Sequence, residues 1–397
     1  MITILLLGLI YLAFISLGLP DSLLGVAWPV MRVDWGLPLD FAGLIAIPIA
    51  ICTILSSLFS GYIIKKFGTG KVITISCLMT GAALLGFSFA PSYIYLMVLG
   101  IPLGFGAGAV DAALNNYVAL HFKAHHMNWL HAFWGIGATL GPLIMSASLT
   151  GPSSWRGGYR TVSIIQLSLG VLFILFYPLW AKHKQQPDYN IEVETEQKNG
   201  KQLHMMEVFK IKGVKAAIAT FAFYVAAEFS VGLWGSSFLV DVKRISAETA
   251  ASWISLYYGG ITLGRILSGF ISFKLNNRQM IRLGLVISLT GVILLALPLP
   301  EIFLLPSLLL IGLGYAPIFP SMIHETPTRF GTAVSQTVIG YQMGFGYLGS
   351  TVMTPLIGVF LRTVNVTLFP FIVLLLIGAI ILFTEKLNRL TVKKASV

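Results

Sequence analysis

Long apolar runs alternate with short polar loops along almost the whole chain. Each run is close to the roughly 20 residues that a helix needs to cross the hydrocarbon core of a bilayer. Prolines inside the runs, such as Pro48 and Pro102, are tolerated in membrane bundles because neighbouring helices satisfy the freed backbone groups. The pattern predicts an all-α membrane protein with twelve transmembrane helices, at 4–30, 39–64, 72–90, 93–120, 128–149, 160–181, 214–240, 250–273, 281–299, 303–323, 332–358 and 366–384.

The longest polar stretch, 182–212, separates the first six spans from the last six. It has no apolar periodicity, so it is interpreted as a linker. We therefore expect an N-terminal six-helix bundle at 1–181, a cytoplasmic linker at 182–212 and a C-terminal six-helix bundle at 213–397. The first run is too long for the core of a signal peptide, which predicts a retained first span.

The two halves of the chain resemble each other at an offset near 208 residues. Similar positions recur in the same order, which indicates a duplicated six-span unit and two pseudo-symmetric bundles. The recurring elements are Asp21 and Gly25 with Glu228 and Gly232, Ser60-Gly61 with Ser268-Gly269, Gly104-Phe105-Gly106 with Gly312-Leu313-Gly314, and Pro142-Leu143-Ile144 with Pro355-Leu356-Ile357.

Composition and charge agree with a membrane location. Hydrophobic residues make up 56% of the chain and charged residues 10%, against about 25% charged in soluble domains, and mean hydropathy is +0.85. The net charge of +11 comes from Lys and Arg in short loops, not from a nucleic-acid-binding face. These basic residues favour one side by about threefold, which predicts cytoplasmic termini in a plasma membrane, the inner membrane of a bacterium. We expect a monomer whose partners are the bilayer, protons and a small solute.

The sequence favours neither a metal site nor an enzyme. Cys52 and Cys77 lie inside apolar segments, which indicates small core residues. His121, His125 and His126 have no acid or cysteine nearby that would complete a metal site. No Gly-Lys-Ser/Thr follows the glycines of 104–108, so they are not a phosphate loop, and no nucleophile–base pair is evident. We expect no cofactor, with a proton gradient as the driving force.

Four ionisable residues fall deep inside predicted spans: Asp21, Asp111, Glu228 and Arg265. Each costs about 2.5–3.5 kcal/mol at the centre of a membrane helix, so each is expected to face a water-filled cavity, to pair, or to stay protonated. A carboxylic acid in a low-dielectric cavity can load and release a proton. We predict proton coupling for the three acids. The alternative is a structural charge pair between Glu228 and Arg265, and Arg265 is also a candidate for gating contacts.

The substrate pocket is predicted from polar and aromatic residues of several spans. Asp111 and Asn115 are four residues apart and share one helix face, where an acid and an amide can hold a hydroxylated ligand. The alternatives are helix-bridging amides, a satisfied core histidine at His131, and aromatic rings that anchor or pack. The aromatic candidates are Trp28, Trp134, Trp234, Tyr257 and Tyr341. The predicted substrate-binding residues are Asn115, Asn116, His131, Trp134, Trp28, Trp234, Tyr341 and Gln342.

The segment Gly61-Tyr62-Ile63-Ile64-Lys65-Lys66-Phe67-Gly68 resembles the loop signature of the major facilitator superfamily. The usual acid of that signature is Lys65 here, so gating by that acid is not carried over. Within the superfamily the chain is similar to the fucose–proton symporter family and its hexose-transporter relatives. The resemblance lies in Leu19-Pro20-Asp21, in Asp111 with Asn115, in 128–135 and in Gly264-Arg265.

This resemblance implies the major facilitator fold and a role for Asp21 and Asp111 in proton coupling and sugar recognition. Asp111 is shorter than the Glu of the fucose symporter, and His131 and Trp134 replace polar amides. The chain is thus predicted to be a proton-coupled symporter of a small polar solute, a monosaccharide, that works by alternating access.

Two other functions remain open from the sequence. A drug–proton antiporter or lipid exporter on the same fold is the alternative, because an element like Gly137 to Pro142 also occurs in exporters. A sensor without transport or an intramembrane enzyme is disfavoured, since the linker is short and no nucleophile–base pair is evident.

Overall fold

The computed structural model describes residues 2–121, 124–183 and 205–391, and this part of the chain is helical throughout apart from its short connections. Ten helical stretches in it are long and apolar enough to cross a membrane. A shorter apolar helix, Phe41–Ser57, and the less apolar α12, which contains Glu248 and Arg265, complete the twelve spans. The predicted all-α fold with twelve spans is thus confirmed.

The N-terminal half contains the first six spans. The first span breaks at Ser22 and the sixth at Phe176, where single non-helical residues separate two helices. Its helices are α1 (Ile2–Asp21), α2 (Leu23–Asp34), α3 (Phe41–Phe67), α4 (Thr69–Ser88), α5 (Tyr93–His121), α6 (Ala124–Leu149), α7 (Ser154–Leu175) and α8 (Tyr177–His183).

The C-terminal half repeats this arrangement, with its fourth span broken near Ala316 and Pro317. Several helices extend beyond the expected apolar spans by a turn or more, as polar residues continue them past the apolar core. The helices are α10 (Met205–Val208), α11 (Val214–Asp241), α12 (Ala247–Ile271), α13 (Asn277–Ala296), η1 (Glu301–Phe303), α14 (Leu304–Tyr315), α15 (Ile318–Phe330), α16 (Thr332–Thr363), η2 (Val366–Leu368) and α17 (Phe369–Thr391). Most of the predicted linker lies outside the described residues, so its boundaries remain a prediction.

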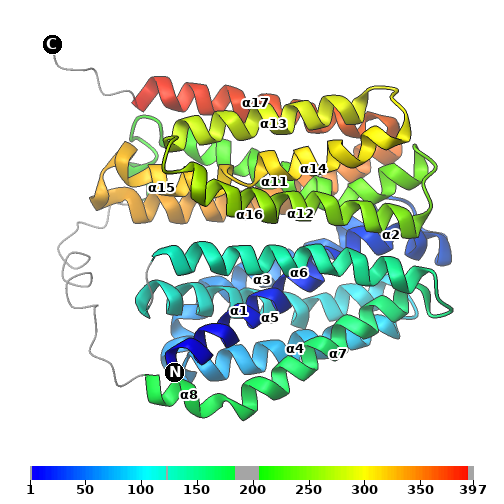
Figure 1. The fold of residues 1–397 in the computed structure, drawn as a ribbon, viewed down its shortest axis with the longest axis horizontal. Coiled ribbons are helices and arrows are strands. Elements are labelled where there is room, and N and C mark those ends of the chain that lie inside the picture. The colour runs from blue at the N-terminus through cyan, green and yellow to red at the C-terminus, as the bar shows by residue number, and fades with distance from the viewer. Residues whose placement is uncertain (1, 122–123, 184–204, 392–397) are drawn as a thin grey trace.

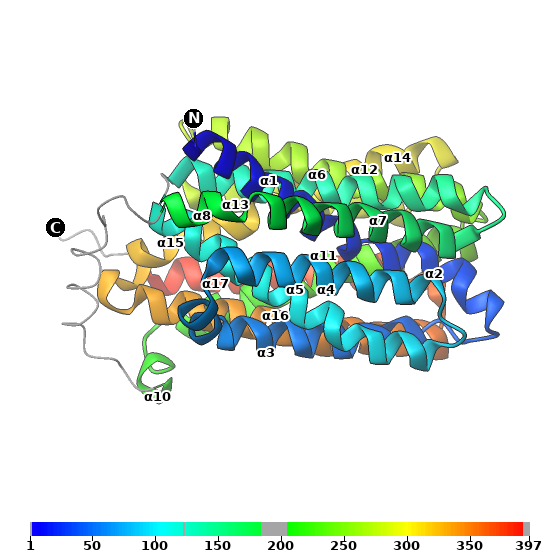
Figure 2. The same ribbon diagram turned by 90° about the horizontal axis from the view of Figure 1, so that it is seen from below.

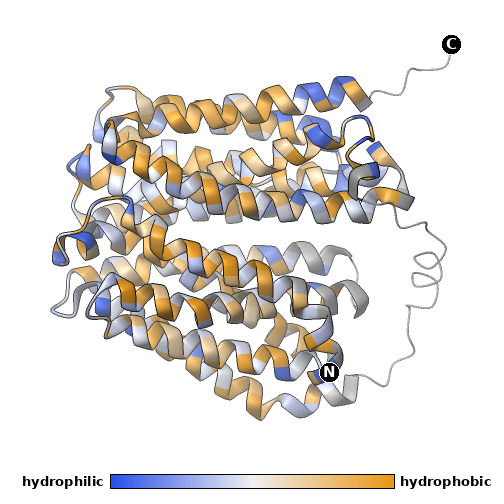
Figure 3. Ribbon diagram, turned by 180° about the vertical axis from the view of Figure 1, so that it is seen from behind, coloured by the Kyte–Doolittle hydropathy of each residue, from blue (hydrophilic) through white to orange (hydrophobic). Residues whose placement is uncertain are grey.

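The two halves lie side by side as separate bundles, α1 to α8 in one and α11 to α17 in the other (Figures 1 and 2). The first turn of α1, the helix α8 and the last turn of α17 lie at one end of the molecule, and α2 lies at the opposite end (Figure 1). We call these the linker end and the α2 end. Apolar residues dominate the middle of the helices, and hydrophilic ones gather at the helix ends and loops (Figure 3). This distribution fits a bilayer around the middle of the bundle.

The halves meet mainly through four helix pairs: α2 with α11, α2 with α12, α3 with α16, and α6 with α12. The α2–α11 crossing joins Gly25 to Gly232, two positions that the internal repeat makes equivalent. Gly25 leaves no room for a Cβ against the Gly232 carbonyl oxygen, so only glycine allows the backbones to approach this closely. Two glycines that the internal repeat makes equivalent thus form the close helix contact at the pseudo-symmetric centre of the fold.

Ion pairs join the two halves at the α2 end. Arg32 pairs with Asp241, and Arg362 Nε lies 3.0 Å from Asp40 Oδ1. Each pair takes one residue from each half, and the cation comes from the N-terminal half in one and from the C-terminal half in the other. The Ser146 hydroxyl adds a hydrogen bond of 2.7 Å to the carbonyl oxygen of Glu248.

Among the side chains that the structure describes, α16 shows no equivalent packing at the linker end. Pro355 of this helix packs against Gly43 of α3, but Gly344, three turns away on the same face, is exposed with open space where a Cβ would lie. Gly340 is open in the same way. The structure is therefore closed at the α2 end and open at the linker end.

Replacing Arg362 by Gln is expected to weaken closure of the α2 end. The change leaves the buried carboxylate of Asp40 without its cation. Because Arg362 is itself partly exposed, the expected loss is about 1 kcal/mol, or roughly fivefold in the equilibrium between closed and open. Spin labels at Val33 and Ile302, both exposed at this end, should show a larger long-distance population. Exchanging the charges, with Asp40→Arg and Arg362→Asp together, should restore the parent distribution; a double variant as open as Arg362→Gln would contradict this role.

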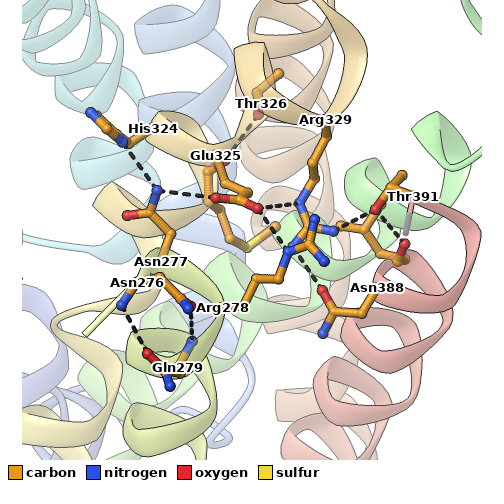
Figure 4. Close-up of polar contacts among 12 residues, drawn as sticks. Asn276, Asn277, Arg278, Gln279, His324, Glu325, Thr326, Arg329, Asn388 and Thr391 are labelled. Atoms are coloured by element: carbon orange, nitrogen blue, oxygen red, sulfur yellow. Dashed lines mark hydrogen bonds and ion pairs between the residues drawn. The ribbon is translucent and has the colours of Figure 1, made fainter. Parts of the chain in front are cut away.

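A polar cluster closes the linker end of the C-terminal half (Figure 4). Glu325 of α15 accepts hydrogen bonds from Arg278 Nε at 2.9 Å and from Asn277 Nδ2 at 3.1 Å. Arg329, one turn further, donates to Asn388 and Thr391 of α17, each at 2.7 Å. The cluster thus ties α13, α15 and α17 together within one half.

Glu325→Gln is expected to lower the melting temperature of the purified protein by about 3–6 °C, because it leaves two guanidinium groups without their shared carboxylate. Arg282→Gln is the matched control. It breaks the more exposed ion pair with Glu385 and should shift the temperature by about 1 °C or less. Equal shifts in the two variants would show that the cluster adds no special stability.

Candidate functional site

Asp21 ends α1 at the break in the first span, near the middle of the bundle. The close packing of α1 on α6 places it: Gly18 sits directly against the backbone carbonyl of Trp134, leaving no space for a side chain. Trp134 Nε1 donates a hydrogen bond of 2.8 Å to Asp21 Oδ2. The Asp21 side chain is nevertheless exposed. Water therefore reaches a carboxylate in the middle of the first span.

The indole of Trp134 also faces the other half of the protein. The guanidinium carbon of Arg265, on α12, lies 5.0 Å from the centre of the Trp134 ring, within the range of a cation–π contact. Arg265 Nη2 is 3.8 Å from Glu228 Oε1 on α11, and both side chains are nearly buried. A continuous series of contacts thus runs from Asp21 through Trp134 and Arg265 to Glu228, across the boundary between the halves.

Asp111 and Asn115 lie on one face of α5, as their spacing predicts. Asn115 Nδ2 donates to Asp111 Oδ1 at 2.8 Å and to the Asp111 backbone oxygen at 3.0 Å. Both side chains are half-buried. Asp111 is close enough to Asp21 for their charges to interact. Within the described ranges neither Asp21 nor Asp111 forms an ion pair.

His131 lies one turn before Trp134 on the same side of α6. Its ring is 5.8 Å from that of Phe14 on α1 and 6.4 Å from that of Phe319 on α15. Phe319 belongs to the C-terminal half, so His131 also stands at the boundary between the halves. Aromatic surface surrounds it on both sides.

Tyrosines of the C-terminal half complete the cluster, and sequence reasoning named only Tyr257 among them. The Tyr257 hydroxyl donates to the backbone oxygen of Glu228 at 3.0 Å. The hydroxyl of Tyr347 on α16 is near enough to Asp21, Asp111 and Glu228 for electrostatic interaction with all three carboxyl groups. The sequence signal that could have identified them is a tyrosine inside a span that lies across the bundle from an acidic span. The tyrosines around the acids are Tyr224, Tyr257, Tyr258, Tyr315 and Tyr347.

Two predicted aromatic ligands lie in the packing between helices. Trp28 is fully buried, and its Nε1 donates to the Leu39 oxygen at 2.7 Å. Trp234 is also buried and donates to the Thr354 oxygen at 2.9 Å. The structure does not bring these rings together with the central acids.

The remaining residues that were predicted to bind substrate lie toward the linker end, or their side chains lie outside the described part of the structure. Tyr341 stacks on Phe209 with ring centres 5.6 Å apart. Gln342 is buried, accepts a hydrogen bond from Thr326 at 3.0 Å, and lines a small cavity beside Arg329. Asn116 lies in α5, but its side chain is outside the described part of the structure. The central cluster therefore contains Asp21, Asp111, Asn115, His131, Trp134, Glu228 and Arg265 of the predicted residues.

Known proteins show the family to which this chain belongs. A model of the Major Facilitator Superfamily matches residues 10–354. The cis,cis-muconate transport protein of Acinetobacter baylyi is 24% identical over 365 residues, covering 88% of this chain and 85% of that protein. The glucose/mannose transporter GlcP of Bacillus subtilis is 25% identical over 268 residues, covering 66% of this chain and 65% of GlcP.

A solved structure shows the same fold at low sequence identity. The nucleoside transporter NupG superposes with a TM-score of 0.76 at 15% identity, covering 96% of this chain and 98% of NupG. The family model covers most of the chain and includes every residue of the central cluster. The protein is therefore a multi-pass membrane protein that belongs to the Major Facilitator Superfamily, a family of transporters.

Proposed function

We propose that this protein is a proton-coupled symporter that imports a small, neutral, polyhydroxylated solute, a monosaccharide, by alternating access. The observation that carries the proposal is a pair of carboxylates, Asp21 and Asp111, that form no ion pair with any described residue and lie next to Asn115 and the ring of Trp134. We further propose that the linker end faces the cytoplasm of a bacterial cell, as the Lys and Arg distribution predicts.

The charge of the cluster favours a neutral solute over an anion. Arg265 is paired with Glu228, and no other cation among the described residues forms an ion pair with Asp21 or Asp111. A dicarboxylate bound here would meet like charge in a low-dielectric site, which costs several kcal/mol. The glucose/mannose transporter is thus a better guide to the substrate class than the muconate transport protein.

The donors and rings of the cluster suit a sugar. A carboxylate accepts hydrogen bonds from hydroxyl groups, and an amide such as Asn115 both donates and accepts. Trp134 and Tyr347 offer aromatic surface beside these groups for the apolar face of a ring. Polar groups that a solute leaves unpaired in such a site penalise analogues that lack the matching hydroxyl.

Two carboxylates inside the membrane also suit proton coupling. An ionised acid at this depth is costly unless it is solvated, paired or protonated. Asp21 is exposed to water in the form open at the linker end, so it can release a proton there. Closing that end removes the water, so an ionised Asp21 would then need a cation as its partner.

A drug–proton antiporter is the second candidate. Phe14 and Phe319 place apolar rings near His131, and Phe221 packs on Phe319, which would suit a lipophilic drug. The segment Gly137 to Pro142, which suggested an exporter, packs on α1: Gly137 and Gly141 lie directly against the backbones of Ile15 and Leu19. Helix packing explains these glycines without an exporter role.

Uptake into liposomes that contain the purified protein distinguishes these candidates. An inwardly directed proton gradient should drive accumulation of one labelled monosaccharide from a panel, with no competition from a dicarboxylate or a lipophilic cation. If no sugar accumulates and a lipophilic cation leaves the vesicles in exchange for protons, the protein is an antiporter and the proposal is wrong.

A further inference from the structure

We propose that Arg265 is a counter-ion shared by two acids. It pairs with Glu228 while the linker end is open and with Asp21 once that end is closed. The ring of Trp134 separates Arg265 and Glu228 from Asp21 in the open form. The inference rests on the proposed proton coupling and adds the mechanism by which protonation biases the two conformations. It concerns how this chain uses the cation at the centre of its bundle, whichever solute it carries.

The geometry places Arg265 between two acids on opposite halves. Glu228, on its own half, is 3.8 Å from Arg265 Nη2, longer than the roughly 2.7–2.9 Å of a tight charged hydrogen bond. Asp21, on the other half, is separated from the guanidinium by one indole ring, which binds Asp21 through its N–H and Arg265 through its face. A small rotation of the indole or a rocking of the halves would open the path between Arg265 and Asp21.

Glu228 has a second donor beside Arg265. The hydroxyl of Tyr224 is buried and lies close to both the Glu228 carboxylate and the Arg265 guanidinium. A buried hydroxyl without a well-placed partner is costly. Departure of Arg265 would let Tyr224 donate fully to Glu228, so the loss at Glu228 is partly offset. Tyr224 therefore remains as a partner of Glu228 when Arg265 leaves.

Trp134 is the neutral donor beside Asp21, as Tyr224 is beside Glu228. In the form open at the linker end, the indole N–H is a neutral donor to Asp21. A neutral donor stabilises a protonated acid or a solvated carboxylate, whereas an ionised Asp21 in a closed, dry site would need a cation. Trp134 is therefore a positioning residue that holds Asp21 until Arg265 replaces it.

The direction of the pH effect follows from these partners. Protonated Asp21 does not attract Arg265, so low pH favours the Arg265–Glu228 pair and the open linker end. Ionised Asp21 attracts Arg265, so high pH favours closure of the linker end. The titratable and charged groups that face Asp21 and Arg265 from the surrounding helices are Asp111, His131, Tyr224, Glu228, Tyr258 and Tyr347.

The test measures conformation without any solute. Spin labels replace the exposed residues Trp129 of α6 and Phe270 of α12, in a protein whose Cys52 and Cys77 are replaced by alanine. These helices pair across the halves, and their linker ends should separate and approach as that end opens and closes. Distances are measured in the full-length protein in lipid nanodiscs at about pH 5.5 and about pH 8.5.

The parent should gain a short-distance population at the higher pH. Asp21→Asn should keep the long distance at both pH values, because it cannot attract Arg265. Glu228→Gln should increase the short-distance population at high pH, because Arg265 loses its present partner. Arg265→Lys should keep the pH response and Arg265→Gln should lose it. Arg282→Gln, which breaks a peripheral ion pair, should respond like the parent.

Two outcomes would overturn the proposal. One is a pH response in Asp21→Asn equal to that of the parent, and the other is a Glu228→Gln protein with the parent's populations. Because no solute is present, a failure of monosaccharide transport would leave this result unaffected. A protein that accumulates sugar but shows neither shift would keep the proposed function and reject the shared counter-ion.

Discussion

Asp111→Asn is expected to abolish proton-driven accumulation of the solute while leaving the protein folded. One pH unit is worth about 1.4 kcal/mol per proton, enough for about tenfold accumulation by a one-proton symporter. An amide cannot carry that proton, so the variant should equilibrate solute to a ratio of about 1. Asn at this position keeps a carbonyl oxygen for the hydrogen bond from Asn115, so helix α5 should fold normally. Labelled solute uptake under an imposed proton gradient measures the ratio.

Exchange of solute across the membrane without a gradient serves as the internal control for this variant. Exchange needs binding and the conformational change but no net proton movement, so Asp111→Asn should retain it. Asp34→Asn is a matched variant at the α2 end, where Asp34 accepts a hydrogen bond from Trp155, and it should accumulate solute. Accumulation by Asp111→Asn at the level of the parent would exclude Asp111 from coupling.

Gly25→Leu is expected to stop transport by preventing the α2 end from closing. The new side chain would collide with the backbone of Gly232 and Leu233, which cannot move aside like a flexible side chain. Forcing extra atoms into such a contact costs about 1–3 kcal/mol or more, so the closed population should fall by about tenfold or more. Spin labels at Val33 and Ile302 should report a long distance, and solute exchange should fall in proportion.

Two other glycines make this prediction specific. Gly8 lies on the same span, and no atom lies within 4 Å of the place that its Cβ would take, so Gly8→Leu should transport normally. Gly312 packs on the backbone of Tyr257 within one half, so Gly312→Leu should reduce folded yield without opening the α2 end. Normal transport by Gly25→Leu would contradict the role of this crossing in closing the α2 end.

The sequence contained enough to predict the twelve spans and the internal duplication. Apolar runs depend on local composition, so they are visible without tertiary information. The repeat that pairs Gly25 with Gly232 could be read in the sequence, but not the direct contact between the two. That contact depends on how the halves pack.

Much of the central cluster was also predictable, because an ionisable residue inside a span has few explanations. Asp21, Asp111, Glu228 and Arg265 were identified in this way, and the alternative of a Glu228–Arg265 pair matches the geometry. The placement of Trp134 against both Asp21 and Arg265 was not predictable, since it joins three helices far apart in sequence.

Aromatic residues were the weakest part of the prediction. Trp28 and Trp234 looked like stacking surfaces, yet their indole N–H groups bond to backbone carbonyls of neighbouring segments. Tyr347 and Tyr258 face the acids, but they resemble the many other tyrosines in the spans. Helix rotation decides which ring faces the centre, and it follows from packing between helices more than from the sequence of one helix.

Proton entry driven by a monosaccharide is the most direct test of the central claim. The purified protein is placed in liposomes that contain a pH-sensitive dye, and sugars are added outside with no pH gradient present. The account predicts acidification of the lumen with one sugar and none with Asp111→Asn. Sugar uptake into the same vesicles without any proton movement, in both the parent and the variant, would contradict proton-coupled symport.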